Sequence, residues 1–298
     1  MTLYTHAESN VRKTWLLITL FLVFIIGLGW VSSQYFRNPA ILIYAVIFSL
    51  LMNVGSFWYS DKIILAITKA RPIKKEDSPE LYRLVENLCI TAGLPAPPIY
   101  ILNEAQPNAF ATGRDKNHAV VCVTRGLLEK LDKTELEGVI SHELSHIGNK
   151  DMLLMTIVVV LVGFIGILSN FFTRSLLFGG GMRRRDDRGE GQAGSILALV
   201  GIILAILSPI VAMLIQLAVS RKREFLADAS GALLTRYPEG LARALEKISA
   251  DKSPMKVASS STAHLFIANP FKGKSFSTLF MTHPPVEERI KILRGMRI

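Results

Sequence analysis

Residues 141–151 read Ser-His-Glu-Leu-Ser-His-Ile-Gly-Asn-Lys-Asp and contain the pattern His-Glu-x-x-His. His142 and His146 are four positions apart, so on a helix both imidazoles lie on one face and can hold one zinc ion. Glu143 lies beside that position, where its carboxylate can act as a base toward water on the metal. Two histidines on an exposed helix face are the plain alternative, and they would need no third ligand elsewhere in the chain.

The residues before this stretch predict a small soluble unit. A helix is expected at residues 78–92, where leucine and valine side chains recur every three or four positions. Short β-branched and apolar runs predict strands at residues 98–102, 108–112 and 119–124. Strands followed by helices, rather than alternating with them, indicate an α+β fold with a small antiparallel sheet.

The motif helix is expected to begin near Thr134, because Thr134 and Glu137 have the spacing of a capping box. The helix contains several charged residues, so we do not expect it to be a membrane span. Only residues 147–151 separate His146 from the next apolar stretch, which is about 9 Å if helical. The predicted zinc site should therefore lie at the membrane surface, which favours membrane-protein substrates.

The composition is that of a membrane protein. Half of the 298 residues are hydrophobic, and the formal net charge is +10. A helix crosses the bilayer with about 20 mostly apolar residues. Stretches that qualify and hold no charged residue are residues 14–31, 39–58, 152–172 and 195–220. We expect up to four transmembrane helices, the first an uncleaved anchor, because its end is a poor cleavage context for a signal peptide.

Basic residues flank these stretches and predict their orientation. They precede the first stretch and follow the second and the fourth, which by the positive-inside tendency places both termini and residues 59–151 in the cytoplasm. The five arginines of residues 173–194 argue against this topology. Either the third and fourth stretches form a hairpin that does not fully cross, or this loop is tolerated outside. Both alternatives leave His146 and Glu224 on the same side.

The charge distribution also bears on partners, and the compartment bears on the two cysteines. The basic residues follow the ends of the apolar stretches, so they favour anionic lipid headgroups over nucleic acid as a partner. Cys89 and Cys122 lie in the part expected in the reducing cytoplasm and have no C-x-x-C partner. We therefore expect two buried thiols.

A third metal ligand is expected directly after the fourth apolar stretch. Glu224 and Asp228 are four positions apart and share a helix face. One carboxylate can bind zinc while the other orients a ligand imidazole. An ordinary charged helix face is the alternative for this pair taken alone.

Together these features resemble the HtpX-type membrane zinc metallopeptidases, relatives of the CAAX prenyl endopeptidases. The resemblance rests on His-Glu-Leu-Ser-His, the following hydrophobic hairpin and Glu-x-x-x-Asp, in that order. Two N-terminal apolar stretches, Asn108-Ala109-Phe110-Ala111 and Thr282-His283-Pro284-Pro285 extend it over essentially the whole chain. The family implies a mainly helical, gluzincin-like protease domain.

The resemblance implies a role for each residue of the expected site. His142, His146 and Glu224 would bind one Zn²⁺ per chain. Glu143 would be the general base that takes the proton of the attacking water and passes it to the leaving amine. Asp228 would orient a ligand imidazole. Peptide hydrolysis by this route forms no covalent intermediate.

The same resemblance implies further site residues. His283 and Arg289 keep a six-residue spacing found in the prenyl-protease relatives. His283 would stabilise the oxyanion of the tetrahedral intermediate, and Arg289 would pair with the acidic groups of the site. Asn108, Ala109 and Phe110 would belong to an edge strand that holds the substrate backbone by strand addition, with a plain sheet edge as the alternative.

These expectations divide the chain into four parts: a membrane anchor at 1–58, two cytoplasmic protease parts at 59–151 and 221–298, and a hydrophobic hairpin at 152–220. The resemblance implies a multi-pass protein of a bacterial-type inner membrane with a cytoplasmic active site. It would cleave misfolded or damaged membrane proteins in quality control and the stress response. Residues 251–280 are expected to lie over the cleft or the bilayer, or to be a flexible linker. No oligomeric state is predicted.

Three other functions fit parts of the pattern. An intramembrane protease of the site-2 type needs the motif inside a span, whereas this motif helix is charged. A CAAX prenyl endopeptidase needs further spans around a large chamber, and the chain has at most four. A metal-binding membrane scaffold without turnover would be expected to lose Glu143 or a ligand, and all are present.

Overall fold

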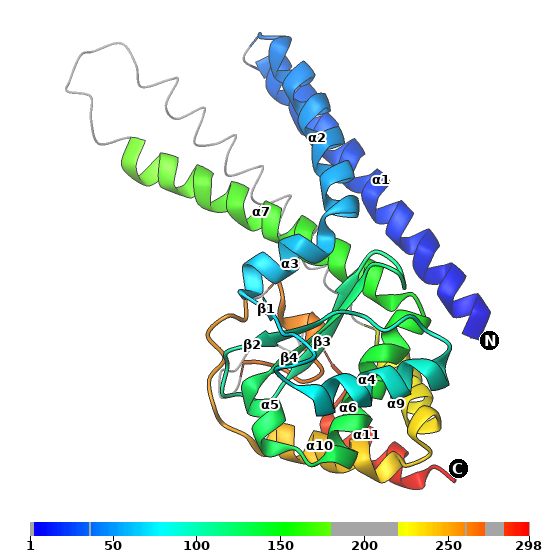
Figure 1. Cartoon of the computed structure of the whole chain (residues 1–298). Helices are drawn as coiled ribbons and strands as arrows, with labels where there is room; N and C mark the ends of the chain where they lie inside the picture. The colour runs from blue at the N-terminus through cyan, green and yellow to red at the C-terminus, as the bar shows by residue number, and fades with distance from the viewer. Residues whose placement is uncertain (1–2, 36, 180–219, 260, 272–282, 298) are drawn as a thin grey trace.

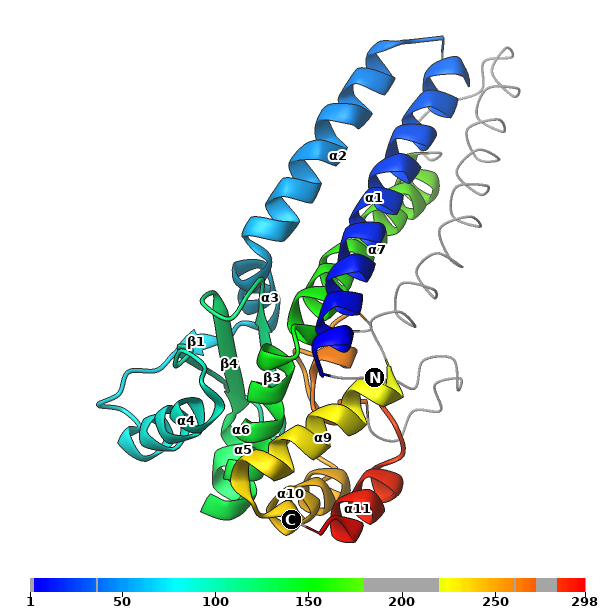
Figure 2. The same cartoon turned by 90° about the vertical axis from the view of Figure 1, so that its right-hand side faces the viewer.

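The computed structural model describes residues 3–35, 37–179, 220–259, 261–271 and 283–297. Three long helices project from one side of a soluble part that holds a small sheet and the shorter helices (Figures 1 and 2). The long helices are α1 (Leu3–Tyr35), α2 (Ala40–Trp58) and α7 (Asp151–Gly179).

The projecting helices match the first three predicted spans. Glu8–Gln34 within α1 and Ala40–Trp58 are each long and apolar enough to cross a membrane. α7 qualifies up to Ile167 only jointly with α6 (Lys133–Gly148), from which it is bent by 85°. Because α6 packs inside the soluble part, the apolar length of this pair belongs to α7. The fourth predicted span lies outside the described residues, apart from Ser220.

α1 and α7 pack against each other through an apolar cluster. It includes Leu17 and Phe21 of α1, four positions apart, and Leu154 and Ile157 of α7. Elsewhere on α1 and α2, large hydrophobic side chains are exposed, among them Trp15 at 55%. Exposed apolar faces of this kind are what a helix presents to lipid. The packing places the start of α7 beside the first turns of α1.

The sheet is mixed, which corrects the predicted antiparallel arrangement. Its strands are β1 (Arg71–Pro72), β2 (Ile99–Leu102), β3 (Ala109–Gly113) and β4 (Ala119–Thr124). The order is β1-β2-β4-β3, with β2 parallel to β4 and the other pairs antiparallel. The chain leaves β2, forms β3 on the far side and returns as β4, so β4 runs in the direction of β2. β3 therefore lies at an edge, as predicted.

Helices cover the sheet and form a common core with it. The predicted helix at 78–92 is confirmed as α4 (Pro79–Ala92), which is followed by Gly93 in the left-handed conformation. Cys89 and Cys122 are buried free thiols, as expected. The remaining helices of the soluble part are α3 (Ser60–Thr68), α5 (Arg125–Lys130), α9 (Arg221–Thr235), α10 (Pro238–Ala250), the short 3-10 helix η1 (Ala263–Leu265) and α11 (Val286–Gly295).

The motif helix α6 is capped by Asp132, and the prediction of Thr134 as its cap is wrong. The Asp132 carboxylate accepts a hydrogen bond from the Glu135 backbone N–H at 2.9 Å, and the Glu135 carboxylate accepts one from the Asp132 N–H at 2.9 Å. The capping box is thus present two residues earlier than its Thr-x-x-Glu copy in the sequence. Thr134 instead donates to the Asp132 carboxylate at 2.7 Å.

Two glycines let α6 approach its neighbours closely. A Cβ added at Gly231 of α9 would lie 2.9 Å from the His142 backbone nitrogen. A Cβ added at Gly138 of α6 would lie 2.6 Å from the Leu241 backbone nitrogen in α10. These contacts are too short for any side chain, so only glycine fits. The close approach brings the residues of α9 against the His-Glu-x-x-His face of α6.

Candidate metal centre

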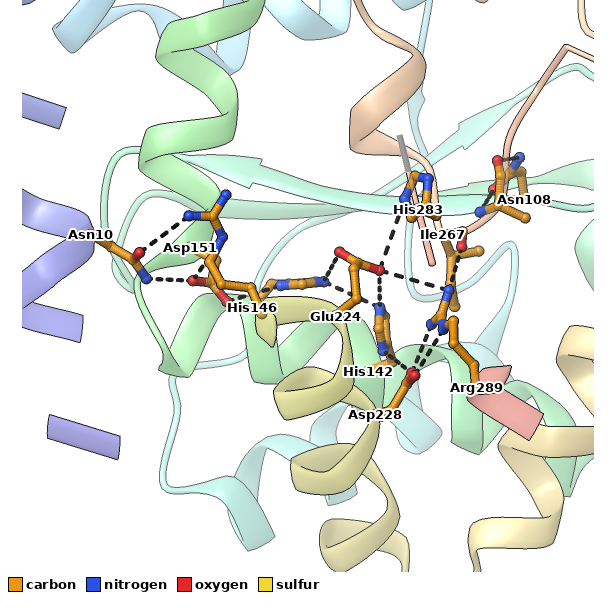
Figure 3. Close-up of polar contacts among 12 residues, drawn as sticks. Asn10, Asn108, His142, His146, Asp151, Glu224, Asp228, Ile267, His283 and Arg289 are labelled. Atoms are coloured by element: carbon orange, nitrogen blue, oxygen red, sulfur yellow. Dashed lines mark hydrogen bonds and ion pairs between the residues drawn. The ribbon is translucent and has the colours of Figure 1, made fainter. Parts of the chain in front are cut away.

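The two histidines of α6 converge inside the protein. Their Nε2 atoms lie 3.1 Å apart, and both side chains are almost fully buried (Figure 3). The exposed-face alternative for this pair is therefore wrong. Because the residues are one helical turn apart, the geometry follows directly from the spacing of the motif.

Glu224 completes the group from the first turn of α9. Its carboxylate oxygens lie 3.8 Å from His142 Nε2 and 3.7 Å from His146 Nε2. One ligand atom from each of the three residues falls within 4.8 Å of the others, and all three side chains are buried. Glu224 Oε2 has no hydrogen-bond partner among the described residues. A buried carboxylate that has one oxygen without a hydrogen bond and lies near two imidazole nitrogens fits a cation, and this donor set suits zinc.

His142 is supported from within the soluble part. Its Nδ1 lies 2.9 Å from Asp228, which accepts two hydrogen bonds, at 2.7 and 2.8 Å, from the guanidinium of Arg289. Burial alone would raise the pKa of Asp228, but Arg289 outweighs it and lowers that pKa. An ionised carboxylate at this distance favours the tautomer of His142 that has its proton on Nδ1, which leaves Nε2 available to a metal.

His146 is supported by a residue that the sequence did not single out. Its Nδ1 lies 3.1 Å from the carboxylate of Asp151, the first residue of α7, which is fully buried. Asp151 also contacts Asn10 of α1 (Figure 3), and it lies 3.8 Å from Arg223 of α9. Asp151 follows the motif by five positions, a spacing that could have marked it. Asn10 carries no local signal, because 141 residues separate it from Asp151.

Glu143 lies beside the metal position in the environment expected of a base. Its side chain is buried, and its Oε1 has no hydrogen-bond partner in the part of the chain that the structure describes. Burial raises the pKa of Glu143 to about 7. A carboxyl group that titrates near neutrality can both accept and return a proton during catalysis.

His283 and Arg289 reach the same centre from the C-terminal part. His283 Nε2 lies 3.9 Å from Glu224, and the Arg289 guanidinium lies 3.7 Å from it. Burial, followed by the charge of Arg289, lowers the pKa of His283 to about 3, so its imidazole is neutral. The predicted pairing of Arg289 with acidic groups is present in the structure. Thr282 of the same motif lies outside the described residues.

The predicted substrate strand is covered by residues 266–268, here called the cover segment. The Asn108 side chain donates to the Ala268 carbonyl at 3.0 Å and accepts from the Ala268 N–H at 3.3 Å. The Ile267 N–H donates to the carbonyl of Ala109 at 3.0 Å. The Phe110 and Phe266 rings pack edge to face at 5.2 Å. The outer edge of β3 is thus paired with the chain's own backbone.

Comparisons with known proteins find a peptidase family and several similar proteins. Residues 75–297 match the family described as Peptidase family M48. The chain is 48% identical over 298 residues to a protease HtpX homolog of Caldanaerobacter subterraneus subsp. tengcongensis, covering 100% of this chain and 99% of the relative. A homolog from Syntrophobacter fumaroxidans is 47% identical over 290 residues, covering 97% and 99%. The crystal structure of S. mikatae Ste24p gives a TM-score of 0.49 at 18% identity, covering 95% of this chain and 67% of that one.

Proposed function

The chain belongs to peptidase family M48 and is an HtpX-type membrane metalloprotease, and from this premise we propose that it cleaves misfolded or damaged membrane proteins. The cleavage would take place at the cytoplasmic face of a bacterial-type inner membrane, as part of proteolytic quality control and the stress response. Two supports come from the molecule: the position of the metal centre relative to the apolar helices, and the distribution of basic residues.

The position of the centre supports a membrane-attached substrate. The imidazole of His146 contacts the carboxylate of Asp151, the residue at which the apolar helix α7 begins. Asn10, at the other side of Asp151, lies in the first turns of the span Glu8–Gln34. The centre therefore lies where two apolar helices enter the soluble part. Basic residues at this level, among them Arg12 and Lys13, favour the cytoplasmic side.

We further propose that one Zn²⁺ per chain is held by His142, His146 and Glu224. When bound, zinc supplies Lewis-acid chemistry, polarising the scissile carbonyl and lowering the pKa of water toward neutrality. Glu143 accepts the proton of the attacking water and delivers it to the leaving amine. The neutral imidazole of His283 donates an N–H to the carbonyl oxygen as negative charge develops on it.

The substrate backbone would bind along β3. An extended peptide can pair with the Ala109 carbonyl and with the side chain of Asn108 once it replaces the cover segment. Strand pairing recognises backbone rather than particular side chains, which suits an enzyme that acts on many unfolded sequences. Phe110 would then face the ring or side chain that takes the place of Phe266.

The observation that carries the proposal is Glu143, which is buried with its Oε1 lacking a hydrogen-bond partner among the described residues, beside the converging side chains of His142, His146 and Glu224. The test uses full-length protein in liposomes together with a membrane-protein substrate whose misfolded domain lies on a known side. Glu143→Gln should bind zinc like the parent and cleave about 10²–10⁴-fold more slowly. Glu137→Gln, on the same helix but outside the centre, should cleave like the parent.

Three results would change the proposal. Equal cleavage by the parent and Glu143→Gln would remove Glu143 as the base. Cleavage of substrates only when the misfolded domain lies on the opposite side would overturn the cytoplasmic assignment. Cleavage of a prenylated CAAX peptide in preference to the misfolded protein would favour the prenyl-endopeptidase alternative.

A further inference from the structure

Asn10 is a buried polar side chain in a helix that is otherwise apolar over most of its length. It is 3% exposed. Its amide nitrogen donates to the Asp151 carboxylate and, at 3.4 Å, to the backbone carbonyl of Asn149. Its amide oxygen accepts from the guanidinium of Arg223 at 3.4 Å. Figure 3 shows Asn10 at one end of a chain of polar contacts that passes through Asp151 to His146.

We propose that Asn10 is a positioning residue for the metal centre, acting through Asp151 on the imidazole of His146. Asp151 binds His146 through Oδ2 and Asn10 through Oδ1. The Asn10 amide therefore fixes the rotation of the carboxylate that in turn fixes the ring of His146. Mutation of groups that orient a metal-binding imidazole through its second nitrogen typically weakens metal binding by about 10–100-fold.

The contacts of Asn10 are long-range, which argues against a purely local role. A second buried asparagine in the anchor, Asn53 of α2, donates to Ser49 of its own helix at 2.9 Å. Asn10 instead bonds residues of α7, of α9 and of the turn before α7. Burying an amide is unfavourable unless its hydrogen bonds are made. The partners that satisfy Asn10 are those around the metal centre.

This arrangement links the membrane anchor to one half of the centre. α1 packs on α7 through Leu17 and Phe21, and α7 begins with Asp151. The two residues that orient His146 thus come from the ends of two apolar helices that pack on each other. Correct seating of α1 against α7 becomes a requirement for the geometry of His146, as well as for attachment to the membrane.

The test measures zinc affinity of the full-length protein in detergent, with a competing chelator. Asn10→Ala should weaken zinc binding on the order of 10-fold or more. Asn10→Asp keeps the size of the side chain and the contact with Arg223 but cannot donate to Asp151, so its loss should be at least as large. Asn53→Ala, which also removes a buried anchor amide, should leave zinc affinity unchanged.

A double-mutant cycle separates positioning from general damage to the fold. If Asn10 acts through Asp151, Asn10→Ala should cost no additional zinc affinity in a protein that already carries Asp151→Ala. Fully additive losses, or an unchanged affinity in Asn10→Ala, would overturn the inference. The inference rests on the proposed zinc site but needs no substrate. Normal zinc behaviour in these variants with no cleavage of misfolded membrane proteins would count against the proposed function alone.

Discussion

The two histidines of the metal centre are held in different ways. His142 is oriented by Asp228, which Arg289 of α11 fixes through two hydrogen bonds. His146 is oriented by Asp151, the first residue of a long apolar helix, which bonds Asn10 of another. The soluble core therefore orients His142, whereas a residue of the membrane anchor contributes to orienting His146.

The two supports also give the histidines different charges at pH 7 in the metal-free protein, with His142 neutral and His146 positive. Burial lowers the pKa of His142 to about 4, although Asp228 opposes the shift. Burial would lower the pKa of His146 as well, but Asp151 and Glu224 outweigh it and raise that pKa to about 9. The positive charge of Arg289 accounts for part of the contrast, because it neutralises Asp228 and lowers the pKa of His142.

The largest effect is expected from removing the partner of Asp228. Arg289→Met leaves a buried carboxylate without its cation, which should lower the free energy of unfolding by about 3–5 kcal/mol. Arg223→Met should cost less, because Asp151 keeps its bond to Asn10 and its carboxylate lies 3.8 Å from Arg223. Unfolding of detergent-solubilised protein by denaturant measures both.

A matched control sharpens this first prediction. The double variant Arg289→Met with Asp228→Asn removes both charges and should recover part of the stability. Equal losses of unfolding free energy in Arg289→Met and Arg223→Met would contradict the proposed difference between the supports of His142 and His146.

The next effect concerns zinc affinity. Asp228→Asn and Asp151→Asn should each weaken zinc binding by roughly 10–100-fold, because each replaces the charged acceptor that orients a ligand imidazole with a neutral amide. The two variants should differ in the stability of the metal-free protein. Asp228→Asn leaves Arg289 without its carboxylate and should unfold more easily. A larger loss of stability in Asp151→Asn than in Asp228→Asn would show that the contacts with the membrane anchor contribute more to the stability of the fold.

The smallest effect is the release of protons on zinc binding. His146 has a raised pKa and so holds a proton at pH 7, which zinc must displace, whereas His142 is already neutral. Zinc affinity should therefore increase by up to about tenfold per pH unit as the pH rises from 7 toward 9. Titration calorimetry in two buffers that differ in ionisation enthalpy counts the released protons.

The same titration tests the cause of the proton release. Asp151→Asn removes the carboxylate that raises the pKa of His146, so it should reduce the number of protons released at pH 7. The number of protons that Asp228→Asn releases should stay close to that of the parent, or fall by less than it does in Asp151→Asn. A parent that releases no proton would mean that His146 is neutral before zinc arrives.

The predictable part of the site is the part that rests on helical spacing. His142 and His146 converge because they are one turn apart, and Glu224 with Asp228 repeats that spacing on α9. Asp151 was missed because it begins the next helix after an 85° bend, where periodicity no longer applies. Asn10 was beyond reach for a different reason, since only tertiary packing brings α1 to Asp151.

The fold shows the same division between local and long-range features. The helix at 78–92 and the strands β2, β3 and β4 were predicted to within one residue, because their apolar patterns are local, whereas the two-residue strand β1 was not predicted. The prediction of an antiparallel sheet was wrong for β2 and β4, because the direction of a strand relative to its neighbour depends on the path of the chain between them. Asp132 replaced Thr134 as the cap because both begin the same four-residue pattern, and pattern alone does not choose between them.

Under the proposed function, the cover segment occupies the position that the substrate backbone would take. An unpaired β3 edge would be open to any extended chain, including another copy of the protein. If a substrate binds along β3 as proposed, it competes with Ile267 and Ala268, which are tethered beside that edge at an effective concentration on the order of millimolar. Under the proposed function, a segment of a folded protein that is short, or that is exposed only briefly, does not displace the cover segment. Long unfolded chains stay extended and meet the β3 edge repeatedly, so they are the substrates expected to displace the cover segment.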